Sequence, residues 1–137
     1  MMKKLKFNYL SEDKKKKSID CYCLEIPIYR VRIKIITPEK NKILTKDWNQ
    51  DESDYDATAE PYLKQDGTVL IRINKFSLEN IVHELYHATD FIMNYIGHKR
   101  TDESDEPSAY LIGYMFKEIL KIKDKIEKTK VDKKEKT

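Results

Sequence analysis

The sequence predicts an α+β domain in which a small, mainly antiparallel sheet packs on two main helices. Three observations lead to this prediction. Residues 21–73 contain apolar residues in the alternation typical of β-strands. Residues 78–96 and 104–126 carry apolar residues at helical spacing. The length of 137 residues suits one domain with a modest core, so we expect a single folded unit at 21–126.

Two strands are expected in the first third of that unit. Apolar residues alternate at 22–28, and the alternation continues in the opposite phase at 31–35. A phase change of this kind indicates a bulge or bend, here near residues 29–30.

A turn, a short strand and a hairpin should follow. Residues 37–41 have the composition of a turn, and the apolar pair Ile43 and Leu44 suggests a short strand. Residues 58–63 and 68–73 then form two strand patterns joined by an Asp-Gly turn, which is typical of a β-hairpin.

The longest amphipathic pattern predicts a helix at 78–96. Ser77 is the expected N-cap, with Asn74 as the alternative, and Gly97 is the expected C-terminal stop. At about 100° per residue, one face is apolar and should meet the core: Leu78, Ile81, Leu85, Ala88, Thr89, Ile92 and Ile96. The opposite face is polar: His83, His87, Asp90 and Asn94.

A second helix should begin at 104–107, where Pro107 suits the first turn, and continue to about Ile126. Residues 127–137 are charged and have little to bury, so we expect a disordered tail. Residues 1–20 show no strong period, and we treat them as a separate Lys-rich segment.

Positive charge is concentrated at the two ends of the chain. Residues 1–20 carry 7 Lys and 3 acidic residues, and residues 117–137 carry 9 Lys and 5 acidic residues, although the net charge of the whole chain is only +3. We interpret both ends as solvated surface. Lys outnumbers Arg by 23 to 4, and specific phosphate recognition favours Arg, so a nucleic-acid partner is not expected.

The cysteines and the apolar runs bear on location. Cys21 and Cys23 lie two apart on a predicted strand, where a mutual disulfide is disfavoured, so we expect reduced, buried thiols. No apolar run approaches the roughly 20 residues that span a bilayer, and the first ten residues lack the apolar core of a signal peptide. We therefore expect a cytoplasmic protein without membrane contact.

The predicted helix at 78–96 contains the motif His-Glu-x-x-His at 83–87. Residues four apart share one helical face, so His83 and His87 can bind one zinc ion. Glu84, about 100° round the helix, can serve as general base. The alternative is that both histidines are ordinary surface residues of an amphipathic helix.

A third zinc ligand must come from elsewhere, because residues 90 and 93 are Asp and Met and exclude the motif extended by a third histidine. The downstream candidates are His98, Asp102, Glu103, Asp105 and Glu106. We select Glu106, because 18 intervening residues suffice for an antiparallel helix to present its carboxylate. Gly113, on the same helical face, would allow the helices to approach closely. The alternative for Glu106 is a helix-capping carboxylate.

These residues resemble the gluzincin (thermolysin-type) branch of zinc metallopeptidases. The stretches HELYHATD, at 83–90, and EPSAYLIGY, at 106–114, are similar to motifs of small HExxH proteins of bacteriophages and mobile elements of gut bacteria. The resemblance covers residues 69–116. It implies a minimal zincin-like fold, Zn²⁺ bound by His83, His87 and Glu106, and Glu84 as general base.

Three further residues have candidate roles. Asp90, one turn beyond His87, could orient a ligand, or could be an exposed helix carboxylate. Tyr110 or Tyr114 could stabilise an oxyanion, or could pack between helices.

The expected function is a zinc-dependent peptidase acting on a peptide or protein substrate. In zincins an edge strand pairs with the extended substrate, and either 58–63 or 68–73 could do so here. The alternative is a non-catalytic binding or structural module of the same fold, which would act through a partner protein. A nucleic-acid-binding role rests on the Lys-rich ends alone, and the oligomeric state stays open.

Overall fold

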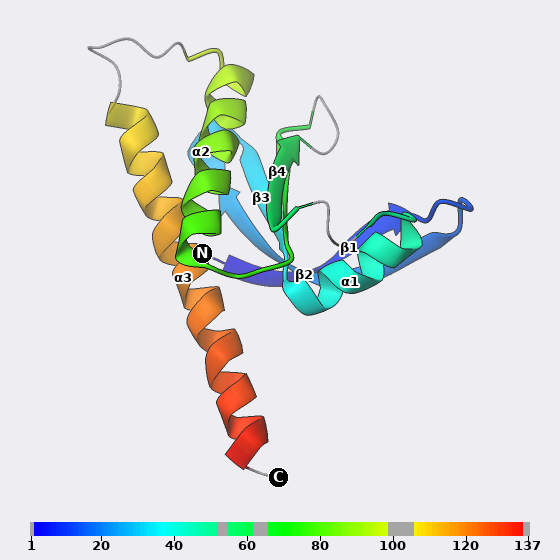
Figure 1. Ribbon diagram of the computed structural model, residues 1–137. Helices are drawn as coiled ribbons and strands as arrows, with labels where there is room; N and C mark the ends of the chain where they lie inside the picture. The colour runs from blue at the N-terminus through cyan, green and yellow to red at the C-terminus, as the bar shows by residue number, and fades with distance from the viewer. Residues whose placement is uncertain (1, 52–54, 62–65, 99–105, 136–137) are drawn as a thin grey trace.

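The computed structural model describes residues 2–51, 55–61, 66–98 and 106–135, the last seven as helix backbone only. Within them lie a five-stranded mixed sheet and three α-helices (Figure 1). The strands are β1 (Met2–Leu10), β2 (Lys16–Ile26), β3 (Val31–Ile36), β4 (Ala57–Pro61) and β5 (Thr68–Ile73). The helices are α1 (Pro38–Asp47), α2 (Leu78–Tyr95) and α3 (Glu106–Glu135). The predicted α+β class is confirmed.

The strand order in the sheet is β1-β2-β3-β5-β4. Only β3 and β5 pair in parallel, and the other three pairings are antiparallel. The prediction of a mainly antiparallel sheet is therefore confirmed. β4 and β1 form its two edges, whereas β5 is an inner strand.

The N-terminal residues belong to the sheet. β1 and β2 pair over nine residues, from Met2 opposite Leu24 to Leu10 opposite Lys16. Phe7 and Ile19 are buried, so this hairpin contributes to a core. The expected boundary between residues 20 and 21 thus falls within β2.

The bend expected near residues 29–30 is present between β2 and β3. A single 3₁₀ turn, Pro27–Tyr29, interrupts the two strands, and Arg30 follows with a left-handed φ of 55°. The turn shifts the register of the chain, which explains the change of phase in the apolar pattern.

The strand predicted around Ile43 and Leu44 is wrong, because these residues lie in helix α1. Pro38 occupies the first turn of this helix, where its missing N–H costs nothing. Asn41, Leu44 and Thr45 are buried at a spacing of three and one, which is a helical period. A single apolar pair is too short to distinguish a strand from a helix.

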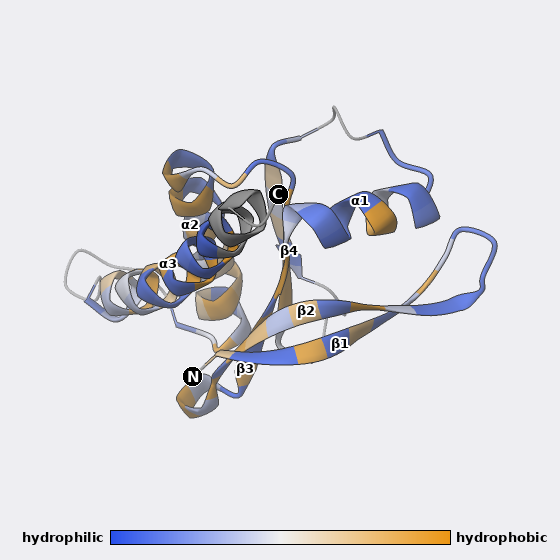
Figure 2. Cartoon of the chain, turned by 90° about the horizontal axis from the view of Figure 1, so that it is seen from below, coloured by the Kyte–Doolittle hydropathy of each residue, from blue (hydrophilic) through white to orange (hydrophobic). Residues whose placement is uncertain are grey.

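The helices cover both faces of the sheet. On β5, Val69, Ile71 and Ile73 belong to the core beneath α2 and α3, whereas Leu70 belongs to a second core with Leu44 of α1. Alternate residues of a strand point to opposite faces, so α1 lies opposite the other two helices (Figure 2). The predicted pair of helices is present, and α1 is an additional layer.

Arg72 of β5 is buried on the α1 side of the sheet, with 2% of its surface exposed. Its guanidinium donates hydrogen bonds to Asn41 Oδ1 (2.8 Å), Gln50 Oε1 (2.7 Å) and Thr45 Oγ1 (3.1 Å). The rings of Trp48 and Tyr55 lie 4.9 and 5.4 Å from its central carbon. The Arg72 guanidinium, hydrogen-bonded to neutral acceptors and flanked by aromatic rings, thus links the sheet to α1.

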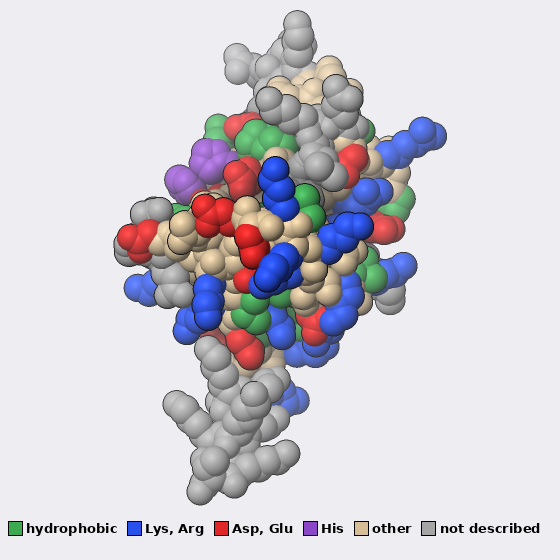
Figure 3. Space-filling model, turned by 90° about the vertical axis from the view of Figure 1, so that its right-hand side faces the viewer, with side chains coloured by type: hydrophobic (Ala, Val, Ile, Leu, Met, Phe, Trp, Pro, Cys, Tyr) green, Lys and Arg blue, Asp and Glu red, His purple; other side chains and the backbone are tan. Residues whose placement is uncertain are grey.

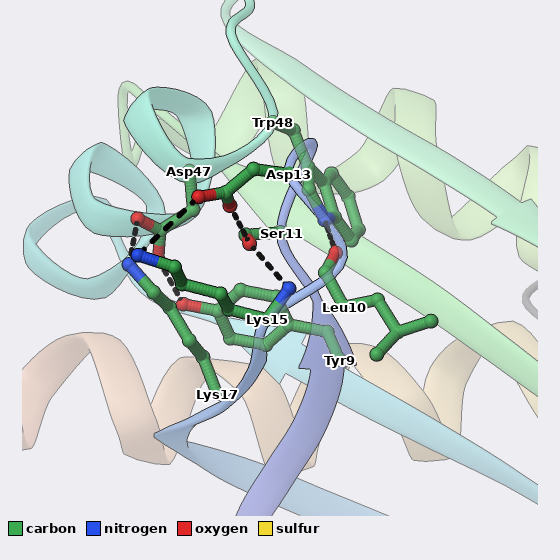
Figure 4. A network of polar contacts seen from close by, with 8 residues as sticks. All are labelled: Tyr9, Leu10, Ser11, Asp13, Lys15, Lys17, Asp47 and Trp48. Atoms are coloured by element: carbon green, nitrogen blue, oxygen red, sulfur yellow. Dashed lines mark hydrogen bonds and ion pairs between the residues drawn. The ribbon is translucent and has the colours of Figure 1, made fainter.

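Polar contacts also join the end of α1 to the β1–β2 hairpin (Figure 4). The Tyr9 hydroxyl donates a hydrogen bond to the Asp47 carboxylate, and Lys17 Nζ lies 2.9 Å from the same group. Burial, aided by Asp47, raises the pKa of Tyr9. Trp48 Nε1 donates to the Leu10 carbonyl at 2.8 Å.

Helix α3 continues to Glu135, beyond the end expected at Ile126 and into the stretch expected to be disordered. The buried apolar side chains of this helix are Leu111, Met115, Ile119 and Ile122. The C-terminal part projects past the sheet in Figure 1. No helix within the described residues is both long and apolar enough to cross a membrane.

Both cysteines are buried, as predicted, and their thiols are free. Burial raises the pKa of Cys21 to about 11. A thiol with this pKa is a poor nucleophile near neutral pH, so Cys21 serves packing.

Candidate metal site

Helix α2 carries the candidate site and begins where the sequence predicts. The Ser77 side chain accepts a hydrogen bond from the Asn80 amide at 3.2 Å, so Ser77 is the N-cap. Gly97, just beyond the last turn, has a φ of 76°, a conformation that favours glycine.

The buried face of α2 differs from the predicted one at its ends. Five of the seven predicted core residues are buried, namely Ile81, Leu85, Ala88, Thr89 and Ile92. Leu78 is exposed and Ile96 is half-buried, while Met93 and Glu84 are buried instead. The buried face of α2 is therefore rotated slightly about the helix axis relative to the predicted face. This rotation places Glu84 against the sheet.

His83 and His87 lie on one exposed face of α2, with their Nε2 atoms 3.2 Å apart. Their rings meet edge to face at a centroid distance of 4.8 Å. Two nitrogen ligands at 2.0–2.1 Å from a tetrahedral zinc are about 3.3 Å apart. The pair thus fits two corners of a zinc site, and histidine side chains lie open at the surface in Figure 3.

Glu84 lies beside the histidines but points toward the sheet. Its carboxylate Oε1 is 3.9 Å from His83 Nε2, and the carboxylate accepts a hydrogen bond from the backbone of Ala59 in β4. Ala57 and Ile119 line the same small hollow. Burial raises the pKa of Glu84, and the two histidines partly oppose that shift. A more basic carboxylate is a better proton acceptor near neutral pH.

This burial has a consequence for stability in the metal-free protein. The pKa of Glu84 in the folded state is raised above its ordinary value of 4.5. The protonated form is thus favoured in the fold, and its contribution to stability is present below 4.5 and lost as the pH rises through the folded pKa. Glu84→Gln is expected to raise Tm at neutral pH and to change Tm little at about pH 3. Thermal unfolding at both pH values, with chelator present, measures this; a lower Tm at neutral pH would contradict it.

Glu106 is not brought to the histidines. It is the exposed first residue of α3. Nine residues separate it from the buried Met115, which puts the two on opposite sides of the helix, about 180° apart. Across the residues that the structure describes, no three His, Cys, Asp or Glu side chains are grouped so as to hold a metal ion. The other candidates Asp102, Glu103 and Asp105 lie outside the described residues.

The remaining candidates are Asp90, His98, Tyr110 and Tyr114. Asp90 is half-buried on the histidine side of α2, and His98 is half-buried beyond its end. Tyr110 and Tyr114 on α3 are 75% and 39% exposed. A Cβ atom at Gly113 would meet nothing within 4 Å, so the close helix approach expected there is wrong.

Strand β4 lies beside the helix that carries the candidate site. β4 is an edge strand and lies along α2, whereas β5 has strands on both sides. Of the two strands proposed for substrate pairing, only β4 lies at an edge of the described sheet. The sequence does not predict the contact between Ala59 and Glu84, because nothing in a short polar strand indicates that it lies beside a helix.

No protein-family model, curated protein sequence or solved structure matched this chain in comparisons with all three.

Proposed function

We propose that this protein is a zinc-dependent peptidase with a minimal zincin-like fold. One observation carries the proposal: two histidine Nε2 atoms lie 3.2 Å apart beside a buried carboxylate, next to an edge strand of the sheet. A zinc ion held there supplies Lewis-acid chemistry, since it polarises a carbonyl and makes a bound water acidic. His83 and His87 would hold the metal.

In this proposal Glu84 moves the proton. Its carboxylate accepts a proton from the water molecule whose oxygen attacks the peptide carbonyl carbon. It then delivers that proton to the amine nitrogen as the C–N bond breaks. The hydrogen bond from Ala59 holds the carboxylate in place, where it can accept and then release the proton.

The substrate would lie along β4. Glu84 occupies the Ala59 N–H and Pro61 has no N–H, but the other backbone groups on the outer edge of Ala57–Pro61 can pair with one strand of an extended peptide. Pairing there would bring a peptide carbonyl to the side of α2 that carries Glu84. A peptide or protein substrate in the cytoplasm agrees with the two free thiols.

Glu106 remains our proposed third ligand, and the first turn of α3 would have to rearrange so that its exposed side faces His83 and His87. Glu106→Ala is expected to weaken zinc binding by more than the roughly 10- to 100-fold that loss of an outer partner costs. His98→Ala should have a smaller effect. Competition against a chromogenic zinc chelator measures both, and a larger loss in His98→Ala would refute this ligand assignment.

A second candidate is a non-catalytic module that binds a partner protein through the same face. The observation in its favour is that the described residues provide two histidine ligands without a third ligand beside them. Such a module has no use for a buried general base, which is why we prefer the peptidase.

One assay tests the proposed function. The purified protein is incubated with a library of synthetic peptides, and the products are identified by mass spectrometry. We expect cleavage that stops when a chelator removes zinc and resumes when zinc is restored. Cleavage that persists in His83→Ala, or its absence from the zinc-loaded wild type, would refute the peptidase.

A further inference from the structure

A hollow of about 290 Å³ lies beside the C-terminal half of α2. Its walls come from α2, the end of β4, and the beginnings of β3 and β5. The lining residues include Val31, Pro61, Val69, Phe91, Asn94 and Tyr95. Its volume is at the lower end of small-molecule sites, which begin at roughly 300 Å³, and suits one amino-acid side chain.

The hollow is next to the candidate site along α2. Phe91 is four residues beyond His87, which is about 6 Å along a helix. Asn94 is eleven residues beyond His83, so it lies on nearly the same face, about 20° away. The rim of the hollow is thus continuous with the face that carries the histidines.

The hollow is equally close along β4. Pro61 lies two residues beyond Ala59, whose backbone contacts Glu84. Two residues of a strand span about 6.8 Å, the spacing between side chains on one face. A peptide paired with β4 that presents a carbonyl near Glu84 would therefore present a side chain of the same face at the hollow.

We propose that this hollow binds an apolar side chain of the peptide substrate, on the N-terminal side of the cleaved bond. The inference rests on the proposed function. Antiparallel pairing is the more stable kind, and β4 runs from Ala57, near Glu84, toward Pro61 at the hollow. A peptide antiparallel to β4 would thus place its more N-terminal residues at Pro61.

The chemistry of the lining selects an apolar side chain. Val31, Val69 and Phe91 offer only hydrocarbon, and no charged side chain is among the described residues that line the hollow. A charged substrate side chain would lose hydration there without gaining an oppositely charged partner.

One wall of the hollow is held by a close contact. Gly67 has a φ of +73°, and a Cβ there would lie 3.1 Å from Tyr95 Cε1. The Gly67 carbonyl accepts a hydrogen bond from the Arg32 amide at 2.9 Å. Gly67 can therefore lie close to the Tyr95 ring, where a side chain would collide with it.

The test uses the zinc-loaded full chain and the peptide library, with cleavage sites read by mass spectrometry. We expect enrichment of Leu, Ile, Val, Met or Phe at one of the three positions before the cut. For two peptides that differ there only by Leu or Asp, kcat/KM should favour Leu by at least about tenfold. Phe91→Lys should bring that ratio close to one. Val82→Lys, exposed on the side of α2 away from β4, is the matched control and should leave the ratio unchanged.

The outcomes separate the two proposals. Cleavage without a preference before the cut, or a preference that Phe91→Lys leaves intact, would overturn the hollow as the specificity site while the peptidase stands. A preference confined to positions after the cut would refute the antiparallel placement. Absence of cleavage in the zinc-loaded wild type would overturn the proposed function, and this inference with it.

Discussion

Glu84→Gln is expected to reduce peptide cleavage by about 100- to 10,000-fold, the range for a lost general acid–base catalyst. Glutamine keeps the shape of the side chain and can still accept the hydrogen bond from Ala59, so the surrounding structure should not change. It cannot take a proton from water, so the attack and the protonation of the leaving amine should both slow. The measurement is kcat/KM for one identified peptide, together with zinc content.

The control for this substitution is Glu39→Gln. Glu39 is exposed in the first turn of α1, on the opposite face of the sheet from the histidines, so its loss should leave kcat/KM within about twofold. If Glu84→Gln retains full activity and full zinc, Glu84 is not the base. If it loses zinc as well as activity, Glu84 acts on the metal itself and the proton-transfer role is wrong.

Arg72→Met is expected to lower the free energy of unfolding by about 3–5 kcal/mol, because hydrogen bonds to a charged group contribute roughly 1.5–3 kcal/mol each and are not additive. Methionine can fill much of the space but provides no donor. The buried Asn41 and Thr45 would each lose a partner out of reach of water, and the exposed Gln50 would lose one as well. The aromatic faces of Trp48 and Tyr55 would also lose their cation.

Urea denaturation followed by circular dichroism measures this loss. Arg32→Met is the matched control, because Arg32 is a half-buried arginine on the neighbouring strand β3 with one weak contact, 3.5 Å to Thr68 Oγ1. The control should cost less than about 1 kcal/mol. Equal losses in the two variants would show that Arg72 is not the link between α1 and the sheet.

The parts of the fold that were predicted correctly depend on local sequence. Ser77 and Gly97 limit α2 because capping needs only residues near a helix end. The Asp-Gly pair and the strand patterns on either side likewise predict the pairing of β4 with β5.

The errors concern elements whose stability comes from distant contacts. α1 has one buried Leu and two buried polar residues, and they become a core face only because Arg72 provides hydrogen bonds from the sheet. The β1 sequence is rich in Lys, which suits an exposed edge strand but obscures its apolar alternation.

The difference between local sequence and distant contacts also applies to the candidate site. The spacing of His83 and His87 is a property of one helix, so the sequence alone predicts their common face. The contact between Glu84 and Ala59 joins two elements and is not encoded in any local pattern. The placement of Glu106 depends on the packing angle of α3, for which 18 intervening residues provide reach but no direction.

The zinc content of the purified chain tests the central claim most directly. Wild-type protein prepared without chelator, then dialysed, is analysed by inductively coupled plasma mass spectrometry beside His83→Ala and Val82→Ala. We predict about one zinc per chain in the wild type and in Val82→Ala, and almost none in His83→Ala. A wild-type chain that contains no zinc and takes up none when it is added, or a His83→Ala chain that retains a full complement, would contradict the account.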